Sequence, residues 1–272
     1  MNSIRNRLPA WGGRGWRLIF FLREYFFPSG CALCDAALIT VSETYYGLCE
    51  HCRNTIEEQG VLDQEAPDRL STAELCDLCG RPLISEHKRC LPCRNAEEPV
   101  FDRAMVLFPY TGKYHRLLGA YKFGKNLALG NFFAEKIREA LASASPDTVI
   151  VPVPPRSGKI KKTGWDQVEY LAALLEKGRG SKNMLRKSIT IKNVDMRVSR
   201  CLRRLPSKVQ KELNQEERKK NLRGRIILKG AAPKTVVLID DVITTGSTLD
   251  ACAAVLKEGG AEKVYGLCLF YT

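Results

Sequence analysis

Beyond residue 100, short runs of β-prone hydrophobic residues alternate with longer segments in which hydrophobic positions recur at helical spacing. The runs predict strands at 104–108, 148–153, 188–192, 235–240 and 263–270. The helical spacing predicts helices at 131–142, 164–177, 215–221 and 247–258. This alternation favours an α/β fold in which helices flank a parallel sheet on both faces. Ligands of such domains bind at the carboxyl ends of the strands.

Residues 236–249 carry the most informative local pattern. The β-prone run ends in Asp240 and Asp241, and a hydroxyl-rich turn with one glycine precedes the next predicted helix. The N–H groups and hydroxyls of the turn, with the positive end of the helix, can form a cradle for a phosphate monoester. The two carboxylates can accept hydrogen bonds from vicinal hydroxyls of a sugar. The alternative is an Asp-Asp turn followed by a helix cap, which leaves paired acids at the end of a buried strand unexplained.

The first hundred residues hold eight of the eleven cysteines, arranged as four Cys-x-x-Cys pairs. The pairs are Cys31/Cys34, Cys49/Cys52, Cys76/Cys79 and Cys90/Cys93. Two thiolates on one tight turn can bind the same ion, and two such turns complete the tetrahedral four-thiolate shell of a zinc ribbon. We therefore expect up to two structural Zn²⁺ ions. Pairing of consecutive motifs is favoured, and interleaved pairing stays open.

The N-terminal segment bears on the alternatives to zinc. Its apolar run, residues 18–22, is shorter than the about 7–15 residues of an export signal. An amphipathic helix that ends at Pro28 is expected instead, with a cytoplasmic location. In that compartment thiols stay reduced, which argues against a disulfide framework, and a redox Cys-x-x-Cys rarely occurs four times. No window approaches the ~20 apolar residues of a membrane span.

Composition locates the charge of the chain. The 272 residues are 44% hydrophobic and 8% aromatic, which excludes a wholly disordered chain, and the formal net charge is +13. Between Lys182 and Lys229, sixteen Lys and Arg face four Asp and Glu, so almost all of the excess lies in one segment. This segment is either a solvated basic insertion or a surface that binds an anion, with a diphosphate and a nucleic-acid backbone as the candidates.

The 236–249 run resembles the phosphoribosyl-diphosphate (PRPP) motif of type I phosphoribosyltransferases, and the chain from about residue 26 to 272 is similar to the ComF family. That family is associated with competence and DNA uptake. Four further features carry the resemblance. They are Tyr121-Lys122-Phe123, Val151-Pro152-Val153-Pro154, the Gln210, Leu213, Arg218 and Asn221 pattern, and the cysteine pairs that follow Phe27-Pro28.

The resemblance implies a type I phosphoribosyltransferase-like domain at 99–272, a double zinc-ribbon module at 29–98 and a helical segment at 1–28. In such a domain Asp240 and Asp241 hold the ribose and act in catalysis, and Mg²⁺ accompanies PRPP. The 5′-phosphate loop would be Thr244, Thr245, Gly246, Ser247 and Thr248, and the pyrophosphate loop Val153, Pro154, Pro155 and Arg156. Lys122, Gln167, Arg204, Gln210 and Arg218 would lie near the substrate.

Two details leave the function open. Pro154-Pro155 is either a cis or strained peptide that directs N–H groups at pyrophosphate, or a plain rigid turn. The family usually has Arg-Gly-Phe-Asn-Gln where this chain has Thr163-Gly164-Trp165-Asp166-Gln167, so an arginine is lost and an acid gained. The leading hypothesis is a phosphoribosyltransferase that uses PRPP and an unidentified acceptor. Its rival is a non-catalytic protein that keeps the fold and binds single- or double-stranded DNA or proteins of the competence machinery.

Overall fold

The structure is a computed structural model of the chain. The residues it describes are 29–60, 75–81, 83, 86–95, 97–109, 112–176, 196–206 and 224–271. Three expected elements fall outside these ranges, namely the N-terminal helix before Pro28, the strand at 188–192 and the helix at 215–221. Within the described residues, none of the helices has the length and apolar character that crossing a bilayer requires.

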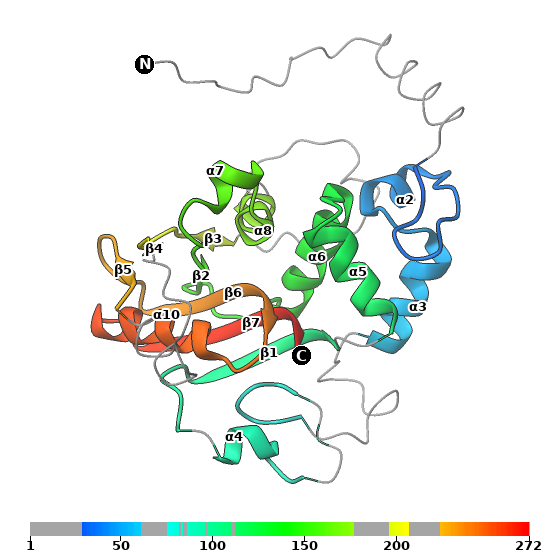
Figure 1. The fold of residues 1–272 in the computed structure, drawn as a ribbon. Coiled ribbons are helices and arrows are strands. Elements are labelled where there is room, and N and C mark those ends of the chain that lie inside the picture. The colour runs from blue at the N-terminus through cyan, green and yellow to red at the C-terminus, as the bar shows by residue number, and fades with distance from the viewer. Residues whose placement is uncertain are drawn as a thin grey trace, which may run out of the picture.

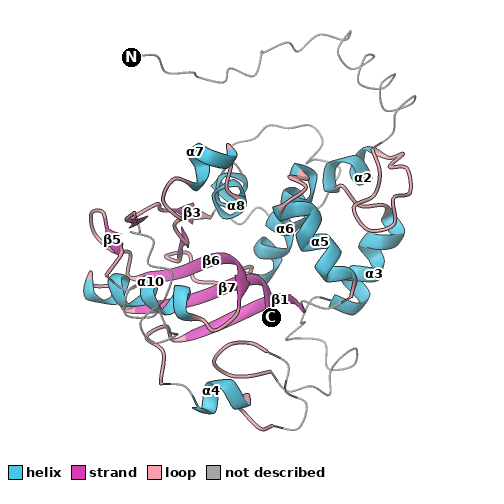
Figure 2. Ribbon diagram, in the orientation of Figure 1, coloured by secondary structure: helices cyan, strands magenta, loops and turns pink. Residues whose placement is uncertain are grey.

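A parallel sheet of five strands forms the centre of the molecule (Figures 1 and 2). Its order is β1-β7-β6-β2-β3, and every neighbouring pair in it is parallel. The strands are β1 (Arg103–Pro109), β2 (Val149–Pro152), β3 (Arg197–Val198), β6 (Thr235–Ile243) and β7 (Lys263–Tyr271). A separate antiparallel hairpin pairs β4 (Leu202–Arg204) with β5 (Ile226–Leu228). The α/β prediction with a parallel sheet is confirmed.

The two faces of the sheet are covered by different helices. Successive side chains of β6 alternate, so Val237 and Ile239 join one hydrophobic cluster while Val236 and Leu238 join the other. The first cluster contains buried residues of α5 (Lys113–Lys122), α6 (Leu127–Ala140) and α8 (Gln167–Glu176). The second contains those of α10 (Ser247–Glu258), together with residues of β4 and β5. A short helix, α7 (Lys159–Thr163), precedes α8.

The two cysteine-rich segments pack against opposite faces of this domain. The first carries α2 (Val41–Tyr46) and α3 (Glu50–Gly60), and its buried residues belong to the same hydrophobic cluster as α6. The second carries α4 (Leu91–Asn95), and its buried residues belong to the cluster that includes α10. In Figure 1 α2 and α3 lie beside α5 and α6, whereas α4 lies across the sheet from them. Each segment therefore completes the core of the sheet domain on its own side.

Aromatic rings fill the first cluster. The ring of Phe108 on β1 lies 6.0 Å from each of the rings of Phe132 and Phe133, and 5.6 Å from that of Phe270 on β7. All four side chains are at most 1% exposed. Ring contacts of this kind and the apolar area they bury stabilise this part of the hydrophobic interior.

The Phe133→Ala substitution is expected to lower the free energy of unfolding by about 3–5 kcal/mol, because it leaves a ring-sized cavity among packed aromatics. Urea denaturation followed by circular dichroism measures the change. The matched control is Phe123→Ala, in which the deleted ring is 78% exposed and little stability should be lost. An equal loss in both variants would contradict this assignment of the core.

Candidate functional site

The segment after the acids of β6 forms a tight turn into α10. The β6 strand runs through Asp240 and Asp241 as far as Ile243, three residues beyond its predicted end. The α10 helix begins at Ser247, as predicted, with Gly246 as its N-cap residue at φ 72°. A side chain larger than hydrogen is strained at that angle, so the glycine is needed there. The hydroxyls of Thr245 and Ser247 lie 2.8 Å apart over the start of the helix.

A cavity of about 640 Å³ opens at the carboxyl ends of β2 and β6. These strands are parallel neighbours, so the loops that follow them meet at one edge of the sheet. The expected site residues that line the cavity are Lys122, Val153, Pro154, Pro155, Arg156, Gln167, Arg204, Asp240, Asp241, Thr244 and Thr248. Thr245, Gly246 and Ser247 lie in the same turn, between two of the lining residues. Gln210 and Arg218 lie outside the described residues.

The pyrophosphate-loop candidate is anchored to the strand that carries the acids. The backbone N–H of Val153 donates to the carbonyl of Ile239, 3.0 Å away, which extends the pairing of β2 with β6 by one residue. Every peptide bond in the described ranges is trans, so the Pro154-Pro155 segment is not a cis turn. The loop therefore leaves the sheet in a fixed direction beside Asp240.

A chain of polar contacts connects four elements around the cavity. The carboxylate of Asp241 lies 2.6 Å from the Lys122 ammonium and accepts a hydrogen bond of 2.6 Å from the Gln167 side-chain amide. The ammonium of Lys159 in turn donates to Gln167, at 2.5 Å, and to Asp166, also at 2.5 Å. Asp166 caps α8 by accepting hydrogen bonds from the backbone N–H groups at 168 and 169. Lysines of α5 and α7 are thus held at the cavity by buried acceptors.

Asp240 is in a different electrostatic position. Burial raises the pKa of its carboxyl well above the usual range, and the adjacent charge of Asp241 raises it further. The backbone N–H of Asp241 donates to the Asp240 carboxyl at 2.8 Å, which opposes that rise in part. Asp241 is held by cationic and amide partners, whereas burial makes Asp240 keep its proton to a higher pH than an ordinary aspartic acid does.

Cationic side chains gather on the other wall of the cavity. Burial lowers the pKa of Arg204 on β4, and the nearby positive charges of Arg156 and Arg225 lower it further. Like charges held close together favour an anion between them. Arg225 belongs to the basic segment but carries no distinctive local pattern, so the sequence did not single it out as a site residue.

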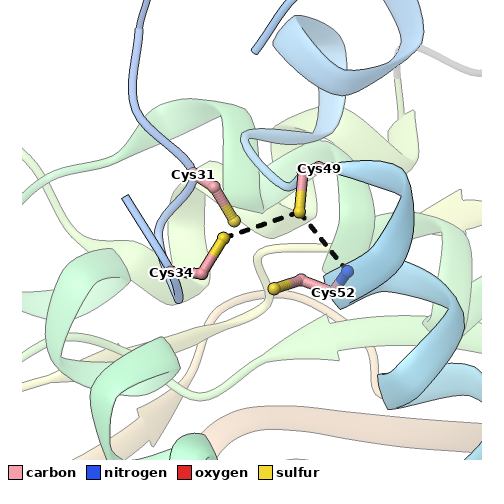
Figure 3. A group of neighbouring side chains, drawn as sticks. All are labelled: Cys31, Cys34, Cys49 and Cys52. Carbon is pink, nitrogen blue, oxygen red and sulfur yellow. Dashed lines mark hydrogen bonds between the residues drawn. The ribbon is translucent and has the colours of Figure 1, made fainter. Parts of the chain in front are cut away.

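The eight N-terminal cysteines form two groups of four, Cys31, Cys34, Cys49 and Cys52, and Cys76, Cys79, Cys90 and Cys93. Consecutive motifs pair, and the sulfur atoms of each group lie within 4.8 Å of one another. The edge of a tetrahedral Zn–S shell is about 3.8 Å, given Zn–S bonds of about 2.3 Å. The Cys34–Cys49 and Cys79–Cys90 sulfur separations are 3.6 and 3.7 Å. In Figure 3 the first four side chains converge on one another from two segments.

Backbone N–H groups surround the first cysteine of each group. Burial raises the pKa of the Cys31 thiol, but N–H groups of Cys49, Cys34 and Leu33 outweigh it and lower the value to about 7. The pKa of Cys76 is lowered to about 7 in the same way. A thiolate is the form that binds a metal, and Cys31 and Cys76 are shifted toward it, whereas burial raises the pKa of Cys49, Cys52, Cys79 and Cys93. The geometry of the two groups is therefore what fits zinc.

Comparison with known proteins supports the assignment of this fold. The phosphoribosyl transferase domain family matches residues 171–272. Competence protein F of Haemophilus influenzae is 25% identical over 228 residues, which cover 79% of this chain and 93% of that protein. Competence protein ComFC of Bacillus subtilis is 26% identical over 206 residues, which cover 73% of this chain and 78% of that protein. DNA utilization protein YhgH of Salmonella typhimurium is 26% identical, covering 90% and 98%.

These similarities support the resemblance to the ComF family. The match to the phosphoribosyl transferase domain begins at residue 171 and so contains the acids and the turn of β6, but not the 153–156 loop or the altered 163–167 stretch. The structure shows how the 163–167 stretch of this chain is arranged. Trp165 packs edge-on against Tyr121 with ring centres 5.6 Å apart, and Asp166 pairs with Lys159.

Asp166, the acid gained in that stretch, therefore has a cation beside it. Lys159 is the first residue of α7, and Asp166 stands seven residues further on, beyond the turn at Gly164 that brings the two together. The sequence gave no sign that Lys159 is held by Asp166. That contact depends on where α7 ends, which a spacing pattern does not reveal.

We expect purified protein to contain two zinc ions per chain, and the Cys31→Ser/Cys34→Ser variant to contain one, because each group of four thiolates binds one ion independently. Metal analysis of the purified proteins measures this. Cys201→Ser, which changes a buried cysteine outside both groups, is the control and should keep two. Well under two zinc ions in the unaltered protein would contradict the expectation.

Proposed function

We propose that the cavity binds PRPP and that the protein transfers its phosphoribosyl group to an acceptor, with release of pyrophosphate. The observation that carries the proposal is the convergence of paired acids, a hydroxyl-rich turn at a helix start and a cationic wall on one cavity. PRPP presents the complementary groups, which are vicinal hydroxyls, a phosphate monoester and a diphosphate. The match to the phosphoribosyl transferase domain supports the same conclusion.

Each part of the cavity has a defined task in this proposal. Asp240 and Asp241 accept hydrogen bonds from the ribose hydroxyls and, as negative charges beside the ring, favour positive character at C1′. The turn from Thr244 to Thr248 binds the 5′-phosphate through N–H groups and hydroxyls, aided by the dipole of α10. The ribose is thereby fixed from two sides, which orients C1′ toward the acceptor.

The cationic groups act on the leaving group. Three cations line the cavity, namely Arg156 of the 153–156 loop, Lys159 and Arg204. Their charges stabilise the diphosphate as it departs. The C1′–O bond breaks with its electron pair on the diphosphate oxygen, while a lone pair of the acceptor forms the new bond to C1′. A proton on the acceptor nucleophile passes to water or to a diphosphate oxygen. Arg204 is well placed to stabilise the departing diphosphate, because its burial strengthens its interaction with an anion.

Oxygen donors suited to Mg²⁺ are present at the same place. The carboxyls of Asp240 and Asp241 line the cavity, and carboxylate oxygens are ligands that Mg²⁺ accepts alongside water and substrate oxygens. When bound with PRPP, Mg²⁺ would neutralise charge on the diphosphate. The protein's part is to leave these oxygens accessible at the cavity surface.

A second candidate function is binding of a nucleic-acid backbone. Arg156 and Arg204 line the cavity, and burial together with the nearby charges of Arg156 and Arg225 lowers the pKa of Arg204, as expected for a cluster of cations that could bind an anion. Relatives named for DNA utilization and competence favour DNA, single- or double-stranded, and proteins of the competence machinery as partners. Most of the basic 182–229 segment lies outside the described residues.

Calorimetric titration with PRPP and Mg²⁺ is expected to give saturable binding that Asp240→Asn or Asp241→Asn weakens about 10- to 150-fold. The reason is the loss of a charge-assisted hydrogen bond to the ribose, worth roughly 1.5–3 kcal/mol. Asp147→Asn is the matched control, since Asp147 is exposed and pairs with Arg197 away from the cavity.

Absence of binding to the unaltered protein, or equal binding by the Asn variants, overturns the PRPP proposal. A protein that ignores PRPP but binds a DNA oligonucleotide with an affinity that falls steeply with salt would favour the second function. The acceptor itself is then sought by following pyrophosphate release with candidate small molecules.

PRPP binding is also expected to release a proton. The raised pKa of Asp240 keeps its carboxyl protonated to a higher pH in the free protein, whereas hydroxyl donors and Mg²⁺ favour the ionised form. The affinity for PRPP should therefore rise with pH and level off above the pKa that Asp240 has in the free protein. Titration in buffers of different ionisation enthalpy measures the released proton, and Asp240→Asn removes the contribution of Asp240. Proton uptake by the unaltered protein, or an unchanged release in the variant, would contradict this.

A further inference from the structure

We propose that a second pocket, at the amino ends of the sheet strands, binds a small aromatic carboxylate. The pocket has a volume of about 460 Å³ and lies at the opposite edge of the sheet from Asp240 and Asp241. Arg103, Thr235 and Lys263 line it, and each is the first residue of its strand, β1, β6 or β7. Among the described residues, none lines both this pocket and the cavity that holds the acids, so the inference is independent of the proposed function.

The floor of this pocket is one face of three neighbouring strands. Tyr265 of β7 is in register with Arg103 of β1 on one side and with Val237 of β6 on the other. Lys263 and Met105, each two residues along its strand from one of these side chains, share the same face. The half-buried phenol ring of Tyr265 and the thioether of Met105 therefore offer an apolar surface on which a flat ring can pack, with two cations beside it.

Small side chains opposite this floor leave the space open. The α6 helix ends at Ala140, and the segment that leads from it to β2 contributes Ser143, Ala144 and Ser145 to the lining. None of these side chains is long enough to fill the space beside the Tyr265 ring. A pocket of this volume is of the size that holds one small organic ligand.

The charge of the pocket selects an anion. Its Lys and Arg lining residues, Arg103 and Lys263, are not balanced by any Asp or Glu of the described lining. The acids that flank the pocket along the chain each form a salt bridge with a different cation, and the pKa of Glu262 is lowered chiefly by Lys234 and least by Lys263. Within the described ranges, Arg103 and Lys263 thus keep their charges for a ligand. The flanking pairs, with N–O distances of 2.8–3.2 Å, are Asp102–Lys257, Glu139–Lys136, Asp147–Arg197 and Glu262–Lys234.

The end of α6 opposes an anion, but more weakly than the cations attract it. A helix carries about half a negative charge at its carboxyl end, whereas Arg103 and Lys263 each carry a full positive charge. The planar guanidinium of Arg103 matches a carboxylate with two parallel N–H groups, and the hydroxyls of Thr148 and Thr235 can donate to the same oxygens. An inorganic anion would leave the apolar floor uncovered, and a neutral ring would leave the cations unpaired. An aromatic carboxylate satisfies both parts of the pocket.

The test measures binding of 2-naphthoate and of its neutral analogue 2-naphthamide to the full chain by saturation-transfer NMR titration. We expect the carboxylate to bind about 10-fold more tightly than the amide, as charge-assisted hydrogen bonds at the pocket would give. Arg103→Gln should remove most of this preference and leave binding of the amide unchanged, which also shows that the variant is folded. Tyr265→Ala should weaken binding of both probes, because it removes the ring on which they pack.

Arg204→Gln is the matched control, since it removes an arginine from the other cavity and should leave binding of both probes unchanged. A loss in Arg204→Gln that equals or exceeds the loss in Arg103→Gln places the probe in that cavity and overturns the inference. Equal affinity of the carboxylate and the amide overturns it as well. So does absence of binding to the unaltered protein, the result expected if a second copy of the chain or another segment of it covers the pocket. None of these outcomes bears on PRPP binding, which is measured separately.

Discussion

The carboxylate of Asp241 is 7% exposed, and a buried negative charge of this kind needs partners that replace water. Lys122 from the end of α5 and Gln167 from the start of α8 supply them, each at 2.6 Å. These residues come from distant parts of the chain, so satisfying one charge fixes two helices relative to β6. Lys159 then joins through Gln167, and the polar wall of the cavity is set before any ligand arrives.

The order of the strands in the sheet determines where these residues meet. Because β2 and β6 are adjacent and parallel, the 153–156 loop and the turn after the acids leave the sheet at the same edge. The resulting cavity brings the paired acids and several cationic side chains together on one lining. Neither set would tolerate burial alone, since like charges repel strongly at low dielectric. Side by side they partly neutralise one another, which permits a strongly charged cavity at moderate cost.

Local patterns predicted much of this from the sequence. The α10 helix spans 247–258 as expected, because its hydrophobic spacing and the glycine before it are both encoded within a few residues. The β6 strand is longer than expected because Val242 and Ile243 continue to pair with Phe270 and Tyr271 of β7, a partner that the run of residues does not reveal. Pairing of consecutive cysteine motifs was favoured by spacing, and the structure groups the eight thiols in that way.

Long-range placement was harder to foresee. Cysteine spacing does not say that the two groups pack on opposite faces of the sheet, since that depends on which buried residues meet. The first cysteine-rich segment shows why the placement matters. Asp35 of this segment pairs with Arg116 of α5, and the carbonyl of its Thr55 accepts a hydrogen bond from Lys113, also of α5. The other end of this helix carries Lys122, the partner of Asp241. A metal that orders the first cysteine segment therefore also supports the helix that completes the cavity wall.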